Sequence, residues 1–537
     1  MKNKYLINPC CSTEKKSLNP LTTGSKGILP MSSLDRREFL RVTALGAAGA
    51  TLSSFTPDFL AGKEVLFEDW DPVKPFKIPG RALRVQPVFM YHIMERREQT
   101  SWRPWGSIFT EQSVSEEVHR VSKELSGLSA RSDFRLEILP IIKVRNADEA
   151  AKIHSNNFDV VLLYAASGSG QLFRACTPEN KDTIVFVRHM SGPLYQWYQV
   201  LSTAFLRTDK QGYSLPDSTS PSIHVEDVVV DDYYELQWRL RALYGVKNFL
   251  GQRIVALGGA QGKRAPQAPQ VARDIFKMDI IEIEYESIEK RIANALLDKE
   301  LVSKAEMLTD RYLTLPQTTL VTDRKFVTNA FVLYFLFKNL MHENNSFAFT
   351  IQGCMQTIIP MSKTTACLSL SLLMDEGYLA FCESDFVIIP PAILLGHIAG
   401  KPCFFLNSTF PHNGLVHVAH CAAPRRMDGI NYDPSKILPH FESDYGAAPK
   451  VSLPINKEVT FFNPEYSTNR WLGFKGNIKS NPHLDSCTSQ QIVEIQGDWK
   501  KLKSEARDSH WVMAFGDYLK EGEYAARRIG VKWEDIL

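Results

Sequence analysis

The chain has 537 residues, of which 44% are hydrophobic and 23% are charged. This composition is typical of a globular protein, and the length predicts two to four domains. The formal net charge is only +2, from 62 basic and 60 acidic side chains. Because no run of Lys and Arg is long enough to follow a phosphate backbone, we expect no nucleic-acid partner. The nine cysteines show no CxxC spacing and indicate neither a zinc site nor a disulfide framework.

The N-terminal segment combines an arginine pair with a short apolar stretch. Residues 35–41 read DRREFLR, and the apolar run VTALGAAGATLSSF follows them. A membrane span needs about 20 apolar residues, so this shorter run fits the hydrophobic region of a signal peptide. With its arginine pair it resembles a twin-arginine signal, which predicts export by the twin-arginine machinery to the periplasm or cell envelope. The protein starts either at Met1, with a long leader, or at Met31, and we assign residues 1–62 to the signal and linker.

A first α/β domain is predicted over residues 63–248. Strands are expected over residues 81–91, 134–144, 158–166 and 183–189, and helices over residues 113–125, 146–154 and 231–249. The run FDVVLLYAA is continuously apolar, as in a strand that is buried on both faces. Asn146 is the expected N-cap of the second helix. Strands that alternate with helices predict a parallel sheet.

A second α/β domain is predicted over residues 249–400. Strands are expected over residues 252–259, 279–286 and 347–354, helices over residues 270–276, 288–311 and 327–341, and a further strand-like run over residues 377–390. Two glycine-rich turns follow strands, GGAQGKR in this domain and SGSGQ in the first. Neither matches a phosphate-loop or dinucleotide pattern, so we expect no nucleotide.

The last predicted domain, residues 401–537, differs in character from the first two. Short alternating strands are expected in KVSLPINKEVTFFNPE, RWLGFKGNIKS and QQIVEIQG, with turn residues between them. This pattern predicts an antiparallel β-barrel or sandwich.

The run GYLAFCESDFVIIP contains three polar side chains in an apolar setting. A buried charge there costs several kcal/mol unless another group pairs with it. On a strand, Glu383 and Asp385 would share one face with Phe381, and Ser384 would point to the other face. The pair of carboxylates therefore predicts either a structural ion pair or a metal site.

Other polar residues occur near the ends of apolar runs. Asn407 ends KPCFFLN, His417 and His420 lie in GLVHVAHC, and His510 lies in SHWVMAFG. Since His417 and His420 are three residues apart on a strand, they would face opposite ways, and at most one would join Glu383. A carboxylate, an amide oxygen and imidazoles together suit Mn²⁺ or Mg²⁺. A purely structural role for each histidine is the alternative.

Four stretches resemble the L-fucose/L-arabinose isomerase superfamily, and most closely its fucose-isomerase-like branch. They are CLSLSLLMDEGYLAFCESDF, LLGHIAGKPCFF, GLVHVAHCAAP and SHWVMAFGDYLKEGEYAARRIGV. The resemblance is strongest over residues 347–425 and 480–530, and weaker over residues 81–345. It implies two Rossmann-like parallel-sheet α/β domains followed by a C-terminal antiparallel β-barrel-like domain. It also implies a homo-oligomer and a small-molecule carbohydrate as the ligand.

Enzymes of this family interconvert aldoses and ketoses through a cis-enediol, using Mn²⁺. The resemblance implies that Glu383 is a catalytic carboxylate and a metal ligand, and that His420 and His510 are further ligands. Aligned without a gap from Glu383 through Gly400, the family pattern places its second catalytic carboxylate at Asn407. An amide oxygen can ligate a hard cation, but it cannot act as a general base.

Three hypotheses therefore remain open. The protein is a sugar isomerase that depends on Mn²⁺ or Mg²⁺, or a sugar-binding homologue without the second base, or a relic in which Glu383 pairs with a histidine. Asp385 does not replace the missing base, because the family carries an acid at that position as well.

Overall fold

The computed structural model describes residues 70–178, 180–196, 201, 205–208, 223–467 and 469–537. Trp70–Leu537 belong to one compact unit. The predicted twin-arginine signal, with both possible start positions, lies outside the described residues. Among the described helices, none is by itself long and apolar enough to cross a membrane. The helices Cys354–Ser362 and Cys367–Glu376 reach that length and apolar composition only when taken together, and the chain bends by 92° between them.

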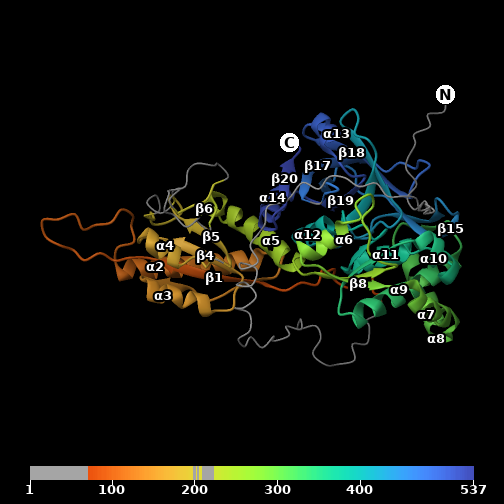
Figure 1. Ribbon diagram of the computed structural model, residues 1–537, viewed down its shortest axis with the longest axis horizontal. Helices are drawn as coiled ribbons and strands as arrows, with labels where there is room; N and C mark the ends of the chain where they lie inside the picture. The colour runs from red at the N-terminus through yellow and green to blue at the C-terminus, as the bar shows by residue number, and fades with distance from the viewer. Residues whose placement is uncertain (1–69, 179, 197–200, 202–204, 209–222, 468) are drawn as a thin grey trace, which may run out of the picture. The chain divides into compact units, whose positions relative to one another are not determined.

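The first parallel sheet has the strand order β2-β1-β4-β5-β6, with β3 also paired to β1 (Figure 1). Its strands are β1 (Leu83–Met90), β2 (Leu136–Ile138), β3 (Ile142–Val144), β4 (Val160–Ala165), β5 (Asp182–Val187) and β6 (Val228–Val230). Strands β1 and β5, which pair with β4, are both parallel to it. Strand β4 is buried throughout, as its apolar run predicted. The strand expected over residues 134–144 is divided into β2 and β3 around Pro140, which lacks a backbone donor.

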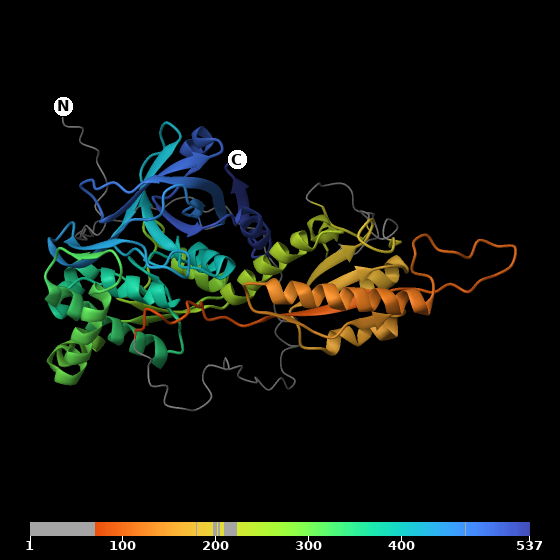
Figure 2. The same ribbon diagram turned by 180° about the vertical axis from the view of Figure 1, so that it is seen from behind.

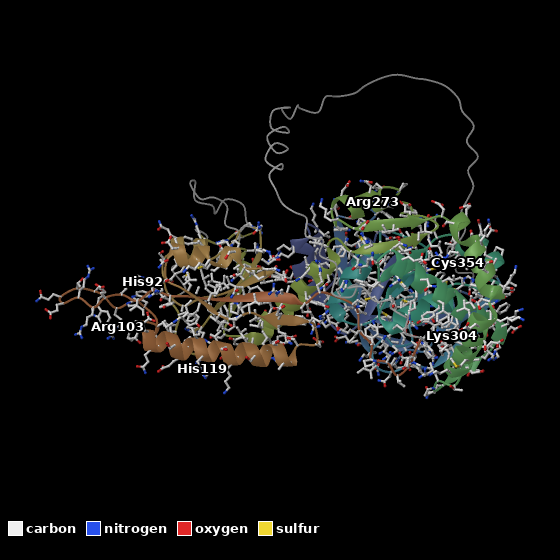
Figure 3. The ribbon with its side chains drawn as sticks, turned by 90° about the horizontal axis from the view of Figure 1, so that it is seen from below. His92, Arg103, His119, Arg273, Lys304 and Cys354 are labelled. Atoms are coloured by element: carbon white, nitrogen blue, oxygen red, sulfur yellow. The ribbon has the colours of Figure 1, made fainter. Side chains whose placement is uncertain are left out.

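The helices of this region precede or follow its parallel strands. They are α2 (Glu111–Arg131), α3 (Ala147–Ala151), α4 (Gly170–Ala175) and α5 (Tyr233–Phe249), with short 3-10 helices η1 (Ile153–Ser155) and η2 (Val225–Asp227). Helix α5 leads from β6 to the second sheet. Helix α2 runs along one face of the sheet (Figure 2), and its His119 is exposed to solvent (Figure 3). The side chain of Asn146 accepts a hydrogen bond from the backbone of Glu149 at 3.0 Å, which confirms the predicted N-cap.

The second parallel sheet has the order β11-β10-β7-β8. Its strands are β7 (Arg253–Leu257), β8 (Asp279–Ile283), β10 (Ala348–Ile351) and β11 (Leu379–Phe381), and its helices are α6 (Ala268–Asp274), α7 (Tyr285–Leu297), α8 (Lys299–Leu313), α9 (Arg324–Glu343), α10 (Cys354–Ser362), α11 (Cys367–Glu376) and α12 (Ile389–Ala399). The helix expected over residues 288–311 is two helices, because Asp298 ends α7 and caps α8.

The strand-like run predicted over residues 377–390 is mostly not a strand. Strand β11 ends at Phe381, and the backbone then turns through left-handed conformations at Glu383 (φ 65°) and Ser384 (φ 50°) before α12 begins. Alternation of side chains therefore does not apply to this acidic segment, and that part of the prediction is wrong. The turn satisfies its buried polar groups through hydrogen bonds to the loop that follows β7.

The C-terminal region is a closed antiparallel barrel, with the order β16-β19-β12-β13-β18-β17 and a further pairing of β17 with β16. Its strands are β12 (Phe404–Ser408), β13 (Leu415–His420), β16 (Glu458–Pro464), β17 (Arg470–Ser480), β18 (Ser489–Gln496) and β19 (His510–Phe515). Outside the barrel are α13 (Trp499–Glu505), α14 (Leu519–Arg528), β20 (Lys532–Asp535) beside β17, and a small sheet of β9 (Thr318–Leu320), β14 (Ser435–His440) and β15 (Tyr445–Val451). The prediction of a mixed α/β protein with two parallel sheets and an antiparallel barrel is confirmed at this level.

Alternate residues of the barrel strands belong to two different cores. Phe404 and Leu406 lie in the barrel interior, whereas Phe405 shares a core with Phe381 at the end of β11 and with Phe386 in the segment after it. The outer face of β12 therefore packs against the segment that follows β11. This packing brings the acidic turn and the barrel histidines to one place.

Candidate functional site

The candidate site lies at the carboxyl edge of the second sheet. Residues 258–264, GGAQGKR, follow β7, and the turn with Glu383 follows β11. Strands β7 and β11 are both parallel to β10, which lies between them, so their carboxyl ends meet at the same edge. In open α/β sheets, ligands bind in the crevice outside this edge.

Backbone hydrogen bonds join the two loops. The backbone N of Gln261 donates to the O of Ser384 at 3.2 Å, and the N of Phe386 donates to the O of Gln261 at 2.8 Å. The Gln261 side chain donates to the O of Glu383 at 2.8 Å, and the Ser384 hydroxyl donates to the O of Gly259 at 2.7 Å. A left-handed conformation costs a non-glycine residue about 1–2 kcal/mol, and these bonds offset that cost.

The barrel contributes two histidines. His510 is the first residue of β19 and lies directly opposite Asn407 of β12, so both side chains project to the same face of the sheet. His420 is the last residue of β13. The ring of Phe405 packs on both imidazoles, with centroid distances of 5.0 Å to His420 and 4.8 Å to His510.

Three nitrogen atoms surround the Glu383 carboxylate. Its Oε1 lies 3.5 Å from Nε2 of His420, and its Oε2 lies 3.4 Å from Nε2 of His510. The Nζ of Lys263 donates to the same Oε2 at 3.2 Å. The Glu383 side chain is 9% exposed and that of Lys263 is 31% exposed, so solvent reaches the site mainly on the lysine side.

Asp385 fixes the orientation of His510. Its Oδ2 lies 2.7 Å from Nδ1 of His510, and its Oδ1 accepts from the backbone N of Lys263 at 3.0 Å and of Val387 at 3.2 Å. With its proton on Nδ1, the neutral His510 ring accepts from Nζ of Lys263 at Nε2, at 3.3 Å. Burial lowers the pKa of His510, but the carboxylates of Glu383 and Asp385 outweigh it and raise the pKa above its ordinary value.

His420 is oriented from its other side. Its Nδ1 accepts a hydrogen bond from the backbone N of Ala422 at 3.3 Å. In the neutral ring, Nε2 therefore carries the proton and faces the Glu383 carboxylate. The site thus combines a buried carboxylate with one neutral-imidazole donor, one ammonium donor and one carboxylate-bound imidazole.

The structure places the predicted residues as follows. Glu383, His420 and His510 come together, and Asn407 lies opposite His510 in the sheet. Of the two histidines in GLVHVAHC, His420 is the one that contacts Glu383, and His417 lies three residues before it on β13. The catalytic and ligand roles of these residues stay predictions.

Sequence reasoning missed Lys263 and Gln261. Both lie in GGAQGKR, which matches neither a phosphate-loop nor a dinucleotide pattern and so gives no local sign of a site. The signal that was available is topological: this loop follows a strand of the same parallel sheet as the turn with Glu383. The sequence pairs Asp385 with Glu383, but it carries no local sign of the contact with His510, which spans 125 positions.

With Lys263 in its present position, Glu383 and His510 do not fit a divalent metal ion between them. Such an ion binds its ligands at about 2.1 Å, and Oε2 of Glu383, Nε2 of His510 and Nζ of Lys263 form a triangle with sides of 3.4, 3.2 and 3.3 Å. An ion bound to the first two atoms would lie within about 4 Å of the ammonium, where like charges repel. In the part of the chain described, no group of three or more His, Cys, Asp and Glu side chains has the geometry to hold a metal. The Mn²⁺ or Mg²⁺ implied by the resemblance stays a prediction.

Comparison with protein-family models and with curated protein sequences finds no match to this chain. The resemblance to the fucose and arabinose isomerases therefore depends on the residues quoted for it. The geometry at Glu383 is an independent source of evidence on function, because it does not use that resemblance.

Proposed function

We propose that the protein acts on a small carbohydrate as an aldose–ketose isomerase that works through a cis-enediol. The observation that carries this proposal is the Glu383 carboxylate, held between His420, His510 and Lys263 at the carboxyl edge of a parallel sheet. A positioned carboxylate can remove a proton from the carbon beside a carbonyl group. Fixed N–H donors beside it stabilise the negative charge that then develops on oxygen.

The reaction needs only proton transfers. Glu383 takes the proton from C2 of an aldose, the C–H electron pair forms the C1–C2 double bond, and the carbonyl π pair moves to O1. Return of a proton to C1 and transfer of the O2 proton to O1 complete the ketose. The two sugars are isomers, so no oxidant, reductant or other co-reactant is required. The Nε2–H of His420 and the ammonium of Lys263 are the donors that this chain offers to the oxygen atoms.

A sugar-binding protein without turnover is the second candidate, and Asn407 favours it. The resemblance places the second catalytic carboxylate at this residue, and Asn407 lies opposite His510 on the face that packs toward the site. A neutral amide cannot accept a proton from the substrate. The third hypothesis, a structural pair of Glu383 with a histidine, is supported by the same short distances to His420 and His510.

The proposal includes the finer fold assignment, in which both parallel-sheet regions are Rossmann-like. Parallel strands joined by helices support it. Export by the twin-arginine machinery to the periplasm or cell envelope, and assembly as a homo-oligomer, remain predictions from the sequence.

Solvent exchange at C2 tests the proposal. The full chain is incubated in D₂O with a panel of pentoses, hexoses and deoxysugars, and deuterium at C2 is measured by NMR. We expect exchange with at least one sugar, and a loss of about 100-fold or more in Glu383→Gln, which keeps the shape but not the base. Undiminished exchange in Glu383→Gln would contradict the role of Glu383.

The same panel separates the alternatives. Sugar binding without exchange, with exchange appearing in Asn407→Asp, would support the binding protein that lacks its second base. Neither binding nor exchange with any sugar would leave the structural pair as the explanation of the site.

A further inference from the structure

Lys263 lies where the isomerase resemblance places a metal ion. Its Nζ is 3.2 Å from Oε2 of Glu383 and 3.3 Å from Nε2 of His510, and the resemblance makes both residues ligands of the ion. Lysine is a compact point charge, and an ammonium group can donate to both atoms at once. A resident positive charge therefore already neutralises the Glu383 carboxylate.

The backbone holds Lys263 in this place. Its N donates to Oδ1 of Asp385 at 3.0 Å, and Asp385 also holds His510. Two residues earlier, Gln261 pairs with Asp385 in a short parallel bridge. The loop, the acidic turn and the barrel histidine are thus one hydrogen-bonded unit. The backbone of Lys263 is fixed within this unit, so its side chain starts from a defined position, unlike that of a lysine on a mobile surface segment.

We propose that the ammonium of Lys263 supplies the positive charge for which related isomerases use a divalent ion, and that the reaction at Glu383 is metal-independent. On substrate binding, one N–H of Lys263 turns to the carbonyl oxygen and stabilises the charge that develops on O1. This inference rests on the proposed function for its catalytic part. Its structural part, that Lys263 occupies the place of the ion, stands without it.

Metal binding in the absence of sugar tests the structural part. Purified full-length protein is dialysed against EDTA, MnCl₂ is added, and bound manganese and the thermal unfolding midpoint are measured. We expect the parent protein to bind no stoichiometric Mn²⁺ and to show no shift in its midpoint. In Lys263→Met the Glu383 carboxylate and the His510 imidazole no longer contact an ammonium group. The variant should therefore bind manganese, and its thermal unfolding midpoint should rise when MnCl₂ is added. The double variant Lys263→Met with Glu383→Gln should lose both.

Control variants separate this effect from general lysine removal. Lys475 lies away from the site, and its Nζ is 2.5 Å from Oδ2 of Asp517. Lys475→Met should therefore leave manganese binding as in the parent. If Lys263→Met does not fold, Lys263→Gln keeps a donor toward Glu383 without the charge and serves in its place. Stoichiometric Mn²⁺ on the parent, or none on a folded Lys263→Met or Lys263→Gln, would overturn the structural part.

Exchange at C2 tests the catalytic part with the same samples. After EDTA treatment the parent should keep its full exchange rate, and Lys263→Met should lose about 100-fold, the scale expected for removing one donor to a developing oxyanion. Lys263→Arg, which keeps the charge, should retain more of the rate than Lys263→Met.

Exchange that stops with EDTA and returns with Mn²⁺ would overturn the metal-independent mechanism while leaving the isomerase function in place. No exchange in any form, with the expected manganese results, would remove the isomerase function and leave the assignment of Lys263 intact.

Discussion

Glu383 and Ser384 show why the acidic turn escaped prediction. Both adopt left-handed backbone conformations, yet neither is a glycine, which is the usual signal for such a turn. The conformation persists because Gln261, from a different loop, bonds to the backbone on either side of Ser384. Strained residues held by their surroundings are concentrated at functional sites, and here the strained residue is the candidate base.

Asp375, near the end of α11, is a fully buried acid outside the site. Its Oδ1 accepts hydrogen bonds from the backbone N of Arg425 at 2.7 Å and of Arg426 at 2.9 Å. Its Oδ2 has no hydrogen-bond partner within the described part of the chain. Burial raises the pKa of Asp375 to about 7, although both arginines act to lower it. The folded protein therefore binds this proton more tightly than the unfolded chain, in which the pKa is about 3.9.

We predict that this acid makes stability fall as the pH rises from about 4 to about 7. Because the folded-state pKa is the higher one, its contribution is complete below the unfolded value and is lost as the pH passes the folded value. The difference corresponds to on the order of 4 kcal/mol. Asp375→Asn keeps an acceptor for the two backbone N–H groups but cannot ionise. The free energy of unfolding, measured in urea across this pH range, should therefore fall less steeply with pH than in the parent.

The control for this prediction is Asp310→Asn. Asp310 is an exposed acid that pairs with Arg324 at 2.6 Å, and its replacement should leave the slope close to that of the parent. A slope in Asp375→Asn as steep as in the parent would show that other groups cause the pH dependence.

At the scale of elements, the packing of α5 on α12 joins the first sheet to the second. Every residue of α12 is buried, and Gly245 of α5 lies against it. A Cβ at Gly245 would lie 2.5 Å from Cγ1 of Ile398, which is too close for any real contact. Glycine at this position therefore sets how closely the two helices approach.

Two glycine-to-alanine substitutions should accordingly have opposite effects. Alanine is favoured over glycine in a helix by about 0.8–1.0 kcal/mol. Gly127 of α2 is exposed and has only the far end of Arg131 near its Cβ position, at 3.6 Å, so Gly127→Ala should stabilise the protein by up to this amount. Gly245→Ala should destabilise it by about 1–2 kcal/mol, because overpacking outweighs the helical gain. Urea denaturation monitored by circular dichroism measures both, and a stabilised Gly245→Ala would disprove the close approach.

At the scale of the whole described unit, α14 connects the barrel region to the first sheet. Arg528 of α14 forms a hydrogen bond and ion pair with Asp227 of η2, and it lies 3.0 Å from Oδ1 of Asp182 in β5. Tyr524 donates to Asp227 at 2.9 Å. Asp227 is almost fully buried, so its charge depends on these partners.

Arg528→Ala should therefore destabilise the protein by about 3–5 kcal/mol, the usual effect of leaving one partner of a buried ion pair uncompensated. The thermal unfolding midpoint should fall clearly. Lys479→Ala removes an exposed pair with Glu494 and should change stability by no more than about 1 kcal/mol. Equal effects of the two variants would mean that the contact of α14 with the first sheet contributes little.

Much of the fold could be predicted because its signals are local. The continuous apolar run of β4, the N-cap at Asn146 and the alternating strands of the C-terminal region all depend on a few neighbouring residues. Pro140 and Asp298 show the limit of this approach, since each divides an element whose apolar pattern continues past it.

Local patterns in the sequence predict most of the elements in their order, and they mark Glu383, Asn407, His420 and His510 as residues whose chemistry could combine. The place of Lys263 beside Glu383, 120 positions later in the chain, follows from long-range packing alone. That meeting depends on β7 and β11 flanking β10 in one parallel sheet, and on barrel closure, which brings His510 to the same edge. Strand order and closure are set by contacts between distant parts of the chain, and no local periodicity encodes them.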